Sequence, residues 1–284
     1  MYRIALIALL AASTWLYQWK NGHFRTSKLL SPLPSVHAPV PTTQIDPLLN
    51  QTFRFLGKGG TCFAFLGEDG HTVLKLFKQQ HSLLFSTPFP GACDHLRIQH
   101  LLTNLKKHSH KQRPFLFNSC RLAHDTLKEE TGLIYLCLQP NTHFARPIKL
   151  IDAWGIPHHI DLSRTEFALQ HKGKLLFPHL SALLHAGQRE EIKQTIDALL
   201  TTIKQRCHKG IGDRDPNLLI NFGYLKGQVI AFDLGSYFPN PALTHPPQMA
   251  RELYLTSYAL QKWLEKHCPD LLDYLLDSIA KVAT

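Results

Sequence analysis

The sequence lacks several features that mark special classes of protein. Its six cysteines lie far apart and include no C-x-x-C pair, so we predict neither a disulfide framework nor a zinc site. It contains no run of five like charges and no internal repeat. No basic motif interleaved with aromatic residues is present either, and we therefore expect no nucleic-acid partner.

What the sequence does contain is the composition of an ordinary globular protein. Hydrophobic residues make up 44% of the chain and charged residues 18%, which is enough apolar material for a core and argues against disorder over the bulk of the chain. The net charge of +10 favours anionic partners such as phosphates, nucleic acid or acidic lipids. The alternative interpretation is that the lysines and arginines are scattered over solvated faces.

One apolar run, residues 4–18, stands near the start of the chain. A spanning helix needs about 20 residues, and an aromatic residue at each end of the run brings it near that length. We therefore predict a membrane anchor over residues 1–19. A cleaved signal peptide, followed by export, is the alternative, because Arg3 and the small residues 11–13 fit that pattern. The anchor is preferred because the run continues through residues 15–17.

The charges around this run predict its orientation. Lys20, Arg25 and Lys28 follow the run, whereas only Arg3 precedes it. Positive charge is enriched on the cytoplasmic side of membrane anchors. We therefore predict a single-pass membrane protein whose body faces the cytoplasm.

A proline-rich stretch separates the anchor from the rest of the chain. Residues 20–50 carry five prolines and no apolar periodicity. Such a composition predicts an extended linker. Residues 51–284 then form the folded domain.

The folded domain opens with three strand patterns. Phe53 and Phe55 alternate with polar residues before glycines interrupt the strand. The pattern resumes over Thr61–Leu66 and, after a turn, over Thr72–Phe77. We predict a three-stranded antiparallel meander with a glycine turn and a D-G turn.

The apolar spacing predicts the remaining elements and the fold class. Further strands are expected over residues 133–138, 148–151, 159–162, 166–170, 218–220 and 229–232. Helices are expected over residues 114–130, 178–185, 190–208, 248–267 and 270–282, and the third has an apolar stripe made of Ile192, Ile196, Leu199, Leu200, Ile203 and Cys207. Strands first and helices after is the order of an α+β protein.

Two features near the start of the domain suit phosphate binding. Gly57, Gly59 and Gly60 stand at a strand turn, where residues without a Cβ let backbone N–H groups approach phosphate oxygens. A plain β-turn explains them about as well. Lys75 lies in an apolar strand, so it either pairs with an anion such as phosphate or occupies a solvated face.

Two later features suit a metal ion. Asp213, Asp215 and Asn217 form one cluster, and Asp233 with Gly235 forms another after an apolar strand. Carboxylate and amide oxygens are the ligands that Mg²⁺ prefers, usually shared with substrate phosphates. Each cluster alone is also explained as a turn. The turn interpretation does not explain why the glycine loop, the strand lysine and both acidic clusters occur in one sequence.

Together these segments resemble the protein-kinase-like superfamily, in order and approximate spacing, from Phe53 to Gly235. GKGGTCFAF is similar to the glycine-rich loop, TVLKLF to the V-A-I-K strand, DRDPNLLI to the catalytic loop and Asp233-Leu234-Gly235 to D-F-G. The resemblance implies a two-lobed fold, with a β-rich lobe over about residues 51–170 and a reduced helical lobe over about 171–284.

The resemblance also implies ATP and Mg²⁺ as cofactors and a role for each residue. Lys75 would contact the α- and β-phosphates, and the backbone from Leu169 to His171 would meet the adenine ring. Asn217 and Asp233 would hold Mg²⁺. The residues that would accept the proton of the acceptor hydroxyl are Asp213 or, alternatively, Asp215. Candidates for the carboxylate that pairs with Lys75 are Asp125, Glu129 and Glu130.

The sequence departs from the kinase pattern at several places. Cys62 stands where a third glycine is expected, no His precedes Asp213 at the usual position, and the spacing from Asp213 to Asn217 is one residue short. No A-P-E motif follows Gly235, and the peptide-docking helices of ordinary protein kinases have no room. We predict a phosphotransferase that acts on a hydroxyl of a small-molecule, glycolipid or protein acceptor. The alternative is a pseudokinase, a membrane-tethered binding or regulatory module.

Overall fold

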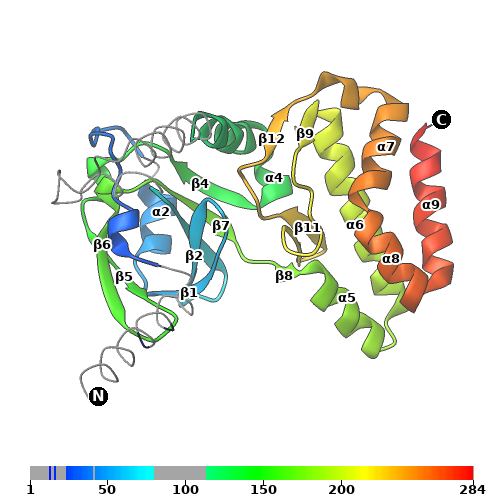
Figure 1. Cartoon of the computed structure of the whole chain (residues 1–284), viewed down its shortest axis with the longest axis horizontal. Helices are drawn as coiled ribbons and strands as arrows, with labels where there is room; N and C mark the ends of the chain where they lie inside the picture. Colours follow the sequence, from blue (N-terminus) through cyan, green and yellow to red (C-terminus); the bar gives the residue numbers. More distant parts are fainter. Residues whose placement is uncertain (1–12, 14–15, 17–23, 41, 80–112, 284) are drawn as a thin grey trace, which may run out of the picture. The chain divides into compact units, whose positions relative to one another are not determined.

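A computed structural model of the chain describes residues 13, 16, 24–40, 42–79 and 113–283 (Figure 1). The chain forms two compact units. The first contains the residues up to Pro114 together with Ile134–His171, and the second contains Phe115–Leu133 and Lys172–Thr284. The first unit is rich in strands and the second in helices. The predicted α+β class is confirmed, and this division is consistent with a two-lobed kinase-like fold.

The first unit is built on a seven-stranded sheet with the order β4-β7-β3-β2-β1-β5-β6. The strands are β1 (Phe53–Lys58), β2 (Cys62–Gly67), β3 (Thr72–Phe77), β4 (Leu133–Cys137), β5 (Pro147–Ile151), β6 (Pro157–Asp161) and β7 (Phe167–His171). β1, β2 and β3 pair antiparallel in succession, so the predicted meander is confirmed. β3 also pairs antiparallel with β7, whereas β1 and β5 run parallel, which makes the sheet mixed.

The segment before the sheet is packed onto it rather than extended. It contains two helices, η1 (Thr26–Lys28) and α2 (Thr42–Leu49), and its apolar side chains Phe24, Leu29, Ile45 and Leu49 are buried in the core of the first unit. The ring of Phe24 meets those of Phe63 and Phe65 edge-on, with 5.2 Å between centroids in each pair. The expectation of an extended conformation rested on the prolines. Burial of these four side chains against the sheet outweighs that preference.

The second unit is organised around the long helix α6 (Arg189–His208). The apolar stripe predicted for this helix is confirmed, because all six of its residues are buried in one core. The surrounding helices are α4 (Lys128–Thr131), α5 (Leu176–His185), α7 (Pro246–Thr256), α8 (Tyr258–His267), α9 (Pro269–Ala283) and a helix over residues 113–126. Figure 1 shows α6, α7 and α9 side by side, which is how their apolar faces close the core.

Short strands in this unit carry the loops of interest. One sheet has the order β11-β10-β8 and another pairs β12 with β9. The strands are β8 (Lys174–Leu175), β9 (Ile211–Asp213), β10 (Phe222–Leu225), β11 (Gln228–Ala231) and β12 (Tyr237–Pro239). Single-turn helices elsewhere in the chain are η2 (Thr142–Phe144), η3 (Leu162–Arg164) and η4 (Pro241–Thr244).

The strand predicted over residues 218–220 is a turn instead. The backbone carbonyl of Asn217 accepts a hydrogen bond from the backbone amide of Asn221 at 2.9 Å. The side-chain oxygen of Asn217 accepts another from the backbone amide of Leu219 at 3.0 Å. These bonds curl the chain, and Leu219 and Ile220 are exposed as a result. The actual strand, β10, begins at Phe222. The prediction followed apolar character and missed the local hydrogen bonds that Asn offers the backbone.

The predicted membrane anchor, and the membrane location derived from it, are corrected. Among the residues that the structure describes, no helix combines the length and the apolar character needed to cross a bilayer. The prediction rested on the apolar composition of residues 1–19. Apart from Ser13 and Leu16, that segment lies outside the described residues.

Candidate functional site

The glycine turn joins β1 to β2 in the first unit. The amide of Gly59 donates to the carbonyl of Cys62 at 3.0 Å, and a β-bulge interrupts the β1–β2 pairing between Phe55 and Gly57. A Cβ placed on Gly57, Gly59 or Gly60 would meet nothing within 4 Å, and none of the three has a positive φ. Neither packing nor backbone conformation therefore requires glycine at these positions. What the glycines provide is open space beside the backbone.

A group of lysines surrounds this turn, and the sequence analysis did not single it out. The ammonium of Lys78 donates to the carbonyl of Gly59 and lies 4.5 Å from the centre of the Phe63 ring. Burial lowers the pKa of Lys78, and the positive charges of Lys58 and Lys28 lower it further, although Cys62 opposes them. Like charges that perturb one another lie close together. The turn is thus bordered by a cluster of cations.

Lys75 occupies the middle of β3 on the sheet face opposite the aromatic core. Its cross-strand partners are Ala64 in β2 and Ala168 in β7. Side chains alternate between the faces of a strand, and the neighbours Leu74 and Leu76 are fully buried on the other face. Because Ala64 and Ala168 are small, the half-buried Lys75 has the longest side chain of these three cross-strand neighbours. The side chain of Lys75 therefore lies on the sheet face opposite the aromatic core.

The residues predicted to meet adenine lie in β7. Leu169 pairs with Leu74 in β3, and its side chain is buried in the core. His171, at the end of the strand, is exposed and pairs with Thr72. The contact of this backbone with an adenine ring stays a prediction.

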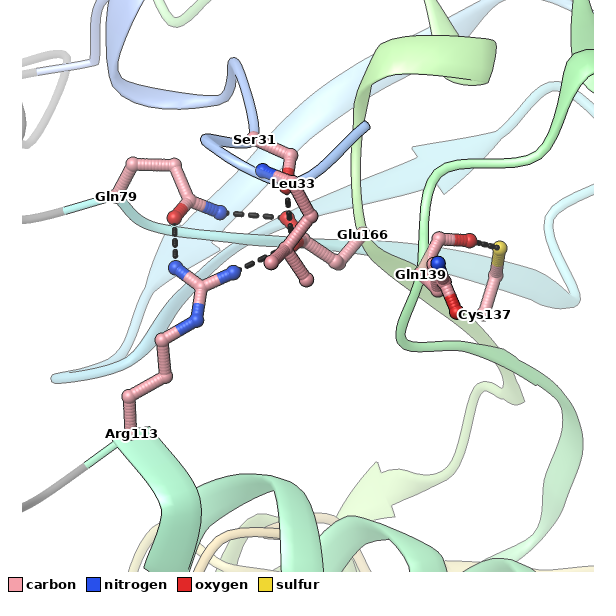
Figure 2. A network of polar contacts seen from close by, with 7 residues as sticks. All are labelled: Ser31, Leu33, Gln79, Arg113, Cys137, Gln139 and Glu166. Atoms are coloured by element: carbon pink, nitrogen blue, oxygen red, sulfur yellow. Dashed lines mark hydrogen bonds and ion pairs between the residues drawn. The ribbon is translucent and has the colours of Figure 1, made fainter. Parts of the chain in front are cut away.

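Figure 2 shows a buried polar network that precedes β7. The carboxylate of Glu166 accepts hydrogen bonds from the hydroxyl of Ser31 at 2.5 Å and from the side-chain amide of Gln79 at 2.6 Å. The guanidinium of Arg113 donates both to Glu166 and to the side-chain oxygen of Gln79. Sequence reasoning missed this network, because its members lie far apart along the chain. It joins the segment at Ser31 to the residues that follow β3 and to those that precede β7.

In the second unit, Asp233 lies close enough to Asp213 for its charge to act on the Asp213 carboxyl. Asp213 ends β9 and Asp233 follows β11. Burial raises the pKa of Asp213, and the negative charge of Asp233 adds to that rise, although the hydroxyl of Ser236, the amide of Asp215 and the charge of Arg206 oppose it. Two predicted site residues from separate strands are therefore brought together.

The other two polar residues of this loop are positioned by backbone contacts. The amide of Asp215 donates to Oδ1 of Asp213 at 3.0 Å, and the carbonyl of Asp215 accepts Nδ2 of Asn221 at 3.0 Å. Asp215 is exposed and Asn217 is half-buried. The Oδ1 atom of Asn217 accepts an amide proton, and because an amide oxygen has two lone pairs it can accept a further partner.

The loop after Asp233 is fixed to the helix 113–126. The buried hydroxyl of Ser119 donates to the carbonyl of Leu234 and accepts the amide of Tyr237, each at 2.7 Å. Oδ1 of Asp233 accepts the amide of Gly235 at 3.0 Å. A Cβ on Gly235 would lie 2.8 Å from Cδ1 of Leu116, so this loop approaches the helix closely. The loop is held in one conformation by both contacts.

The three acidic residues suggested as partners of Lys75 have different surroundings. Glu130 is buried and forms an ion pair with Lys209, whose ammonium also donates to the carbonyl of Thr126 at 2.7 Å. Asp125 contacts His124 at 2.8 Å, and Glu129 is exposed. Glu130 thus already has a cationic partner within its own unit, and the pairing with Lys75 stays a prediction.

The acidic groups of the second unit do not form a dense metal cage. Within the described ranges no group of three or more His, Cys, Asp or Glu side chains could hold a metal ion. Asp213, Asp233 and Asn217 offer two carboxylates and an amide oxygen. Mg²⁺ is commonly held by one or two carboxylates together with substrate phosphates, so this oxygen-rich set suits a magnesium ion that arrives with a nucleotide.

Comparison with known proteins gives distant likenesses only. No protein-family model and no curated protein matches the sequence. Solved structures of the bifunctional kinase-methyltransferase WbdD match at a TM-score of 0.35 and 18% identity, over 78% of this chain and 43% of that one. Rv3197 from Mycobacterium tuberculosis, in complex with erythromycin, matches at 0.33 and 15% identity, over 84% and 60%. This chain therefore spans less than half of the WbdD chain. Likenesses of this size do not establish a common function.

Proposed function

We propose that this chain is a kinase-like phosphotransferase that uses ATP and Mg²⁺ and acts on a hydroxyl group of its acceptor. The observation that carries the proposal is the position of Asp213 at the end of β9 and of Asp233 after β11 in the second unit, where burial raises the pKa of Asp213 and the charge of Asp233 adds to that rise. Two carboxylates held near each other are costly unless a cation or proton lies with them. A magnesium ion would relieve that repulsion.

The first unit supports the proposal independently. The open glycine turn and its cluster of Lys28, Lys58 and Lys78 combine approachable backbone with positive charge, which suits the phosphates of a nucleotide. Lys75, flanked by two alanines, would contact the α- and β-phosphates. The backbone near Leu169 would meet the adenine.

The residues of the second unit would take the chemical roles. Asp233 and Asn217 would hold Mg²⁺, which neutralises charge on the phosphates when bound. Asp213 would accept the proton of the acceptor hydroxyl, and burial equips it for this because a raised pKa makes a carboxylate a better base. Asp215 is the alternative base, although its exposure leaves it closer to solvent.

The first experiment tests nucleotide binding. Mg-ATP at millimolar concentration is expected to raise the melting temperature of the full chain, because a ligand that binds only the folded state stabilises it. The variant Lys75→Ala is expected to lose most of the shift. Lys281→Ala, at an exposed position of α9, removes the same charge elsewhere and should keep it. Absence of any shift in the unaltered chain would count against the proposal.

The second experiment tests turnover. Transfer of labelled phosphate from ATP to water, to the chain itself or to hydroxyl-bearing acceptors is compared for the unaltered chain and for Asp213→Ala, Asp215→Ala and Asp233→Ala. Loss of activity in Asp213→Ala and Asp233→Ala is expected. Nucleotide binding with no transfer in any assay would instead assign the chain a non-catalytic, pseudokinase-like role.

A further inference from the structure

Arg214 stands between Asp213 and Asp215, and its guanidinium contacts two phenyl rings. Its Cζ atom lies 4.2 Å from the centre of the Phe115 ring and 5.2 Å from that of Phe238. The rings come from separate elements, the helix 113–126 and β12. Cation–π contacts hold a guanidinium through its face and leave its N–H donors unused. Both rings therefore position Arg214 without consuming its hydrogen-bonding capacity.

The ring of Phe238 owes its place to Gly212. The two residues are register partners in the β9–β12 pair, and a Cβ on Gly212 would lie 2.5 Å from Cζ of that ring. The φ of Gly212 is not positive, so its backbone conformation is open to any residue. The ring alone requires glycine here. Three residues thus form the surface that Arg214 contacts: the rings of Phe115 and Phe238, and Gly212, which leaves room for the second ring.

Arg214 does not use the acidic groups beside it. Among the described residues its guanidinium forms no ion pair and no hydrogen bond, although its backbone amide donates to the carbonyl of Ser236 at 3.1 Å. The neighbouring carboxylates face other groups, since Oδ1 of Asp213 accepts the amide of Asp215 and Oδ2 of Asp215 lies 3.5 Å from Nδ2 of Asn221. Arg214 is exposed. Its five N–H donors are held in place and open to an incoming group.

We propose that Arg214 binds an oxyanion, a phosphate or carboxylate, on the acceptor substrate. This rests on the proposed function, in which Asp213 accepts the proton of the acceptor hydroxyl. A planar guanidinium pairs with such anions through two parallel hydrogen bonds. Because Arg214 directly follows Asp213 in the chain, an anion held there lies on the same loop as the proposed base. The substrate class is an alcohol that also carries a negative charge, and the net charge of +10 favours its approach.

The experiment measures binding of inorganic phosphate to the full chain by titration calorimetry at fixed ionic strength, without nucleotide or metal. Acetate is the second probe and distinguishes a carboxylate from a phosphate site. The unaltered chain is expected to bind one of the two saturably. Arg214→Gln is expected to weaken that binding at least tenfold, and Arg214→Lys less, because lysine keeps the charge but not the planar fork.

Two further variants separate the site from general charge and folding effects. Arg121→Gln removes an exposed arginine of the helix 113–126 that contacts Asn118, and it should bind like the unaltered chain. Phe238→Leu keeps Arg214 but removes one ring, and it should weaken binding by less than Arg214→Gln does. Each variant is compared at a temperature well below its own unfolding transition.

The outcomes separate this inference from the proposed function. The inference is overturned if Arg214→Gln binds phosphate and acetate as tightly as the unaltered chain does. It is also overturned if the unaltered chain binds neither anion saturably. Both results hold whether or not Mg-ATP binds. Arg214-dependent binding in a chain that shows no Mg-ATP shift supports the anion site and overturns the proposed function. Lys75→Ala serves as the internal check, since it should lose the nucleotide response and keep the phosphate response.

Discussion

The buried carboxylate of Glu166 is paired with the guanidinium of Arg113, and the two lie in parts of the first unit separated along the chain. The side chain of Glu166 has no exposed area, whereas that of Arg113 is 32% exposed. Gln79 joins both residues, as Figure 2 shows. A buried carboxylate of this kind is tolerated because its hydrogen-bond partners replace water.

Removing the cation from this network is expected to destabilise the chain. Arg113→Met leaves the buried Glu166 without its ion pair, and we expect the free energy of unfolding to fall by about 3 kcal/mol. The double variant Arg113→Met/Glu166→Gln should lose less than the sum of the two single variants, because the uncompensated charge is then gone. Urea unfolding measures both. Strict additivity in this cycle would show that the pair is not coupled.

Ser119 is expected to matter more than an ordinary helical serine. Ser119→Ala strands the carbonyl of Leu234 and the amide of Tyr237, both of which its hydroxyl satisfies, and unmade buried hydrogen bonds cost about 1–3 kcal/mol each. Thr126→Ala, which removes an exposed hydroxyl from the same helix, is the control and should change stability little. Thermal unfolding compares the two. Similar losses in both variants would argue against a special role for Ser119.

The pKa of Asp213 is expected to lie above its ordinary value of 3.8, chiefly because of burial. The folded chain then holds this proton more tightly than the unfolded chain. The contribution of Asp213 to stability therefore falls as the pH rises from 3.8 through the raised folded pKa. Asp233→Asn removes a neighbouring negative charge and should lower the pKa of Asp213. NMR titration of the carboxyl groups, without nucleotide, measures the pKa of Asp213 in the unaltered chain and in Asp233→Asn. The same pKa in both would contradict the claim that Asp233 lies near Asp213.

Asp69, in the turn between β2 and β3, shows the opposite shift. Burial alone would raise its pKa, but hydrogen bonds from the hydroxyl and amide of Thr72, the amide of His71 and the side chain of Gln51 lower it to about 2. Its stabilising contribution is therefore present above the unfolded pKa and is lost as the pH falls from 3.8 towards 2.

The variant Asp69→Asn is expected to cost about 1 kcal/mol at pH 7 and much less near pH 2. Urea unfolding at the two pH values measures the difference, with Asp277→Asn at an exposed position of α9 as the control. A loss for Asp69→Asn that does not depend on pH would show that the carboxylate charge is not what the turn requires.

Local patterns predicted much of the fold. The meander β1–β3 and the buried stripe of α6 follow from apolar spacing that repeats every two or 3.6 residues, and both are present. The predictions failed where a few side chains override composition. Asn217 turns the chain where apolar residues suggested a strand, and the buried Phe24 and Ile45 draw a proline-rich segment onto the sheet.

The candidate site divides in the same way. The residue types alone indicated which residues suit phosphate and metal chemistry, because a glycine turn, a strand lysine and two acidic loops follow one another along the chain. It could not determine the surroundings of Asp213, the network at Glu166 or the rings beside Arg214. Those depend on residues far apart in the chain that only folding brings within a few ångströms, and burial and neighbouring charge then set the chemistry of each group.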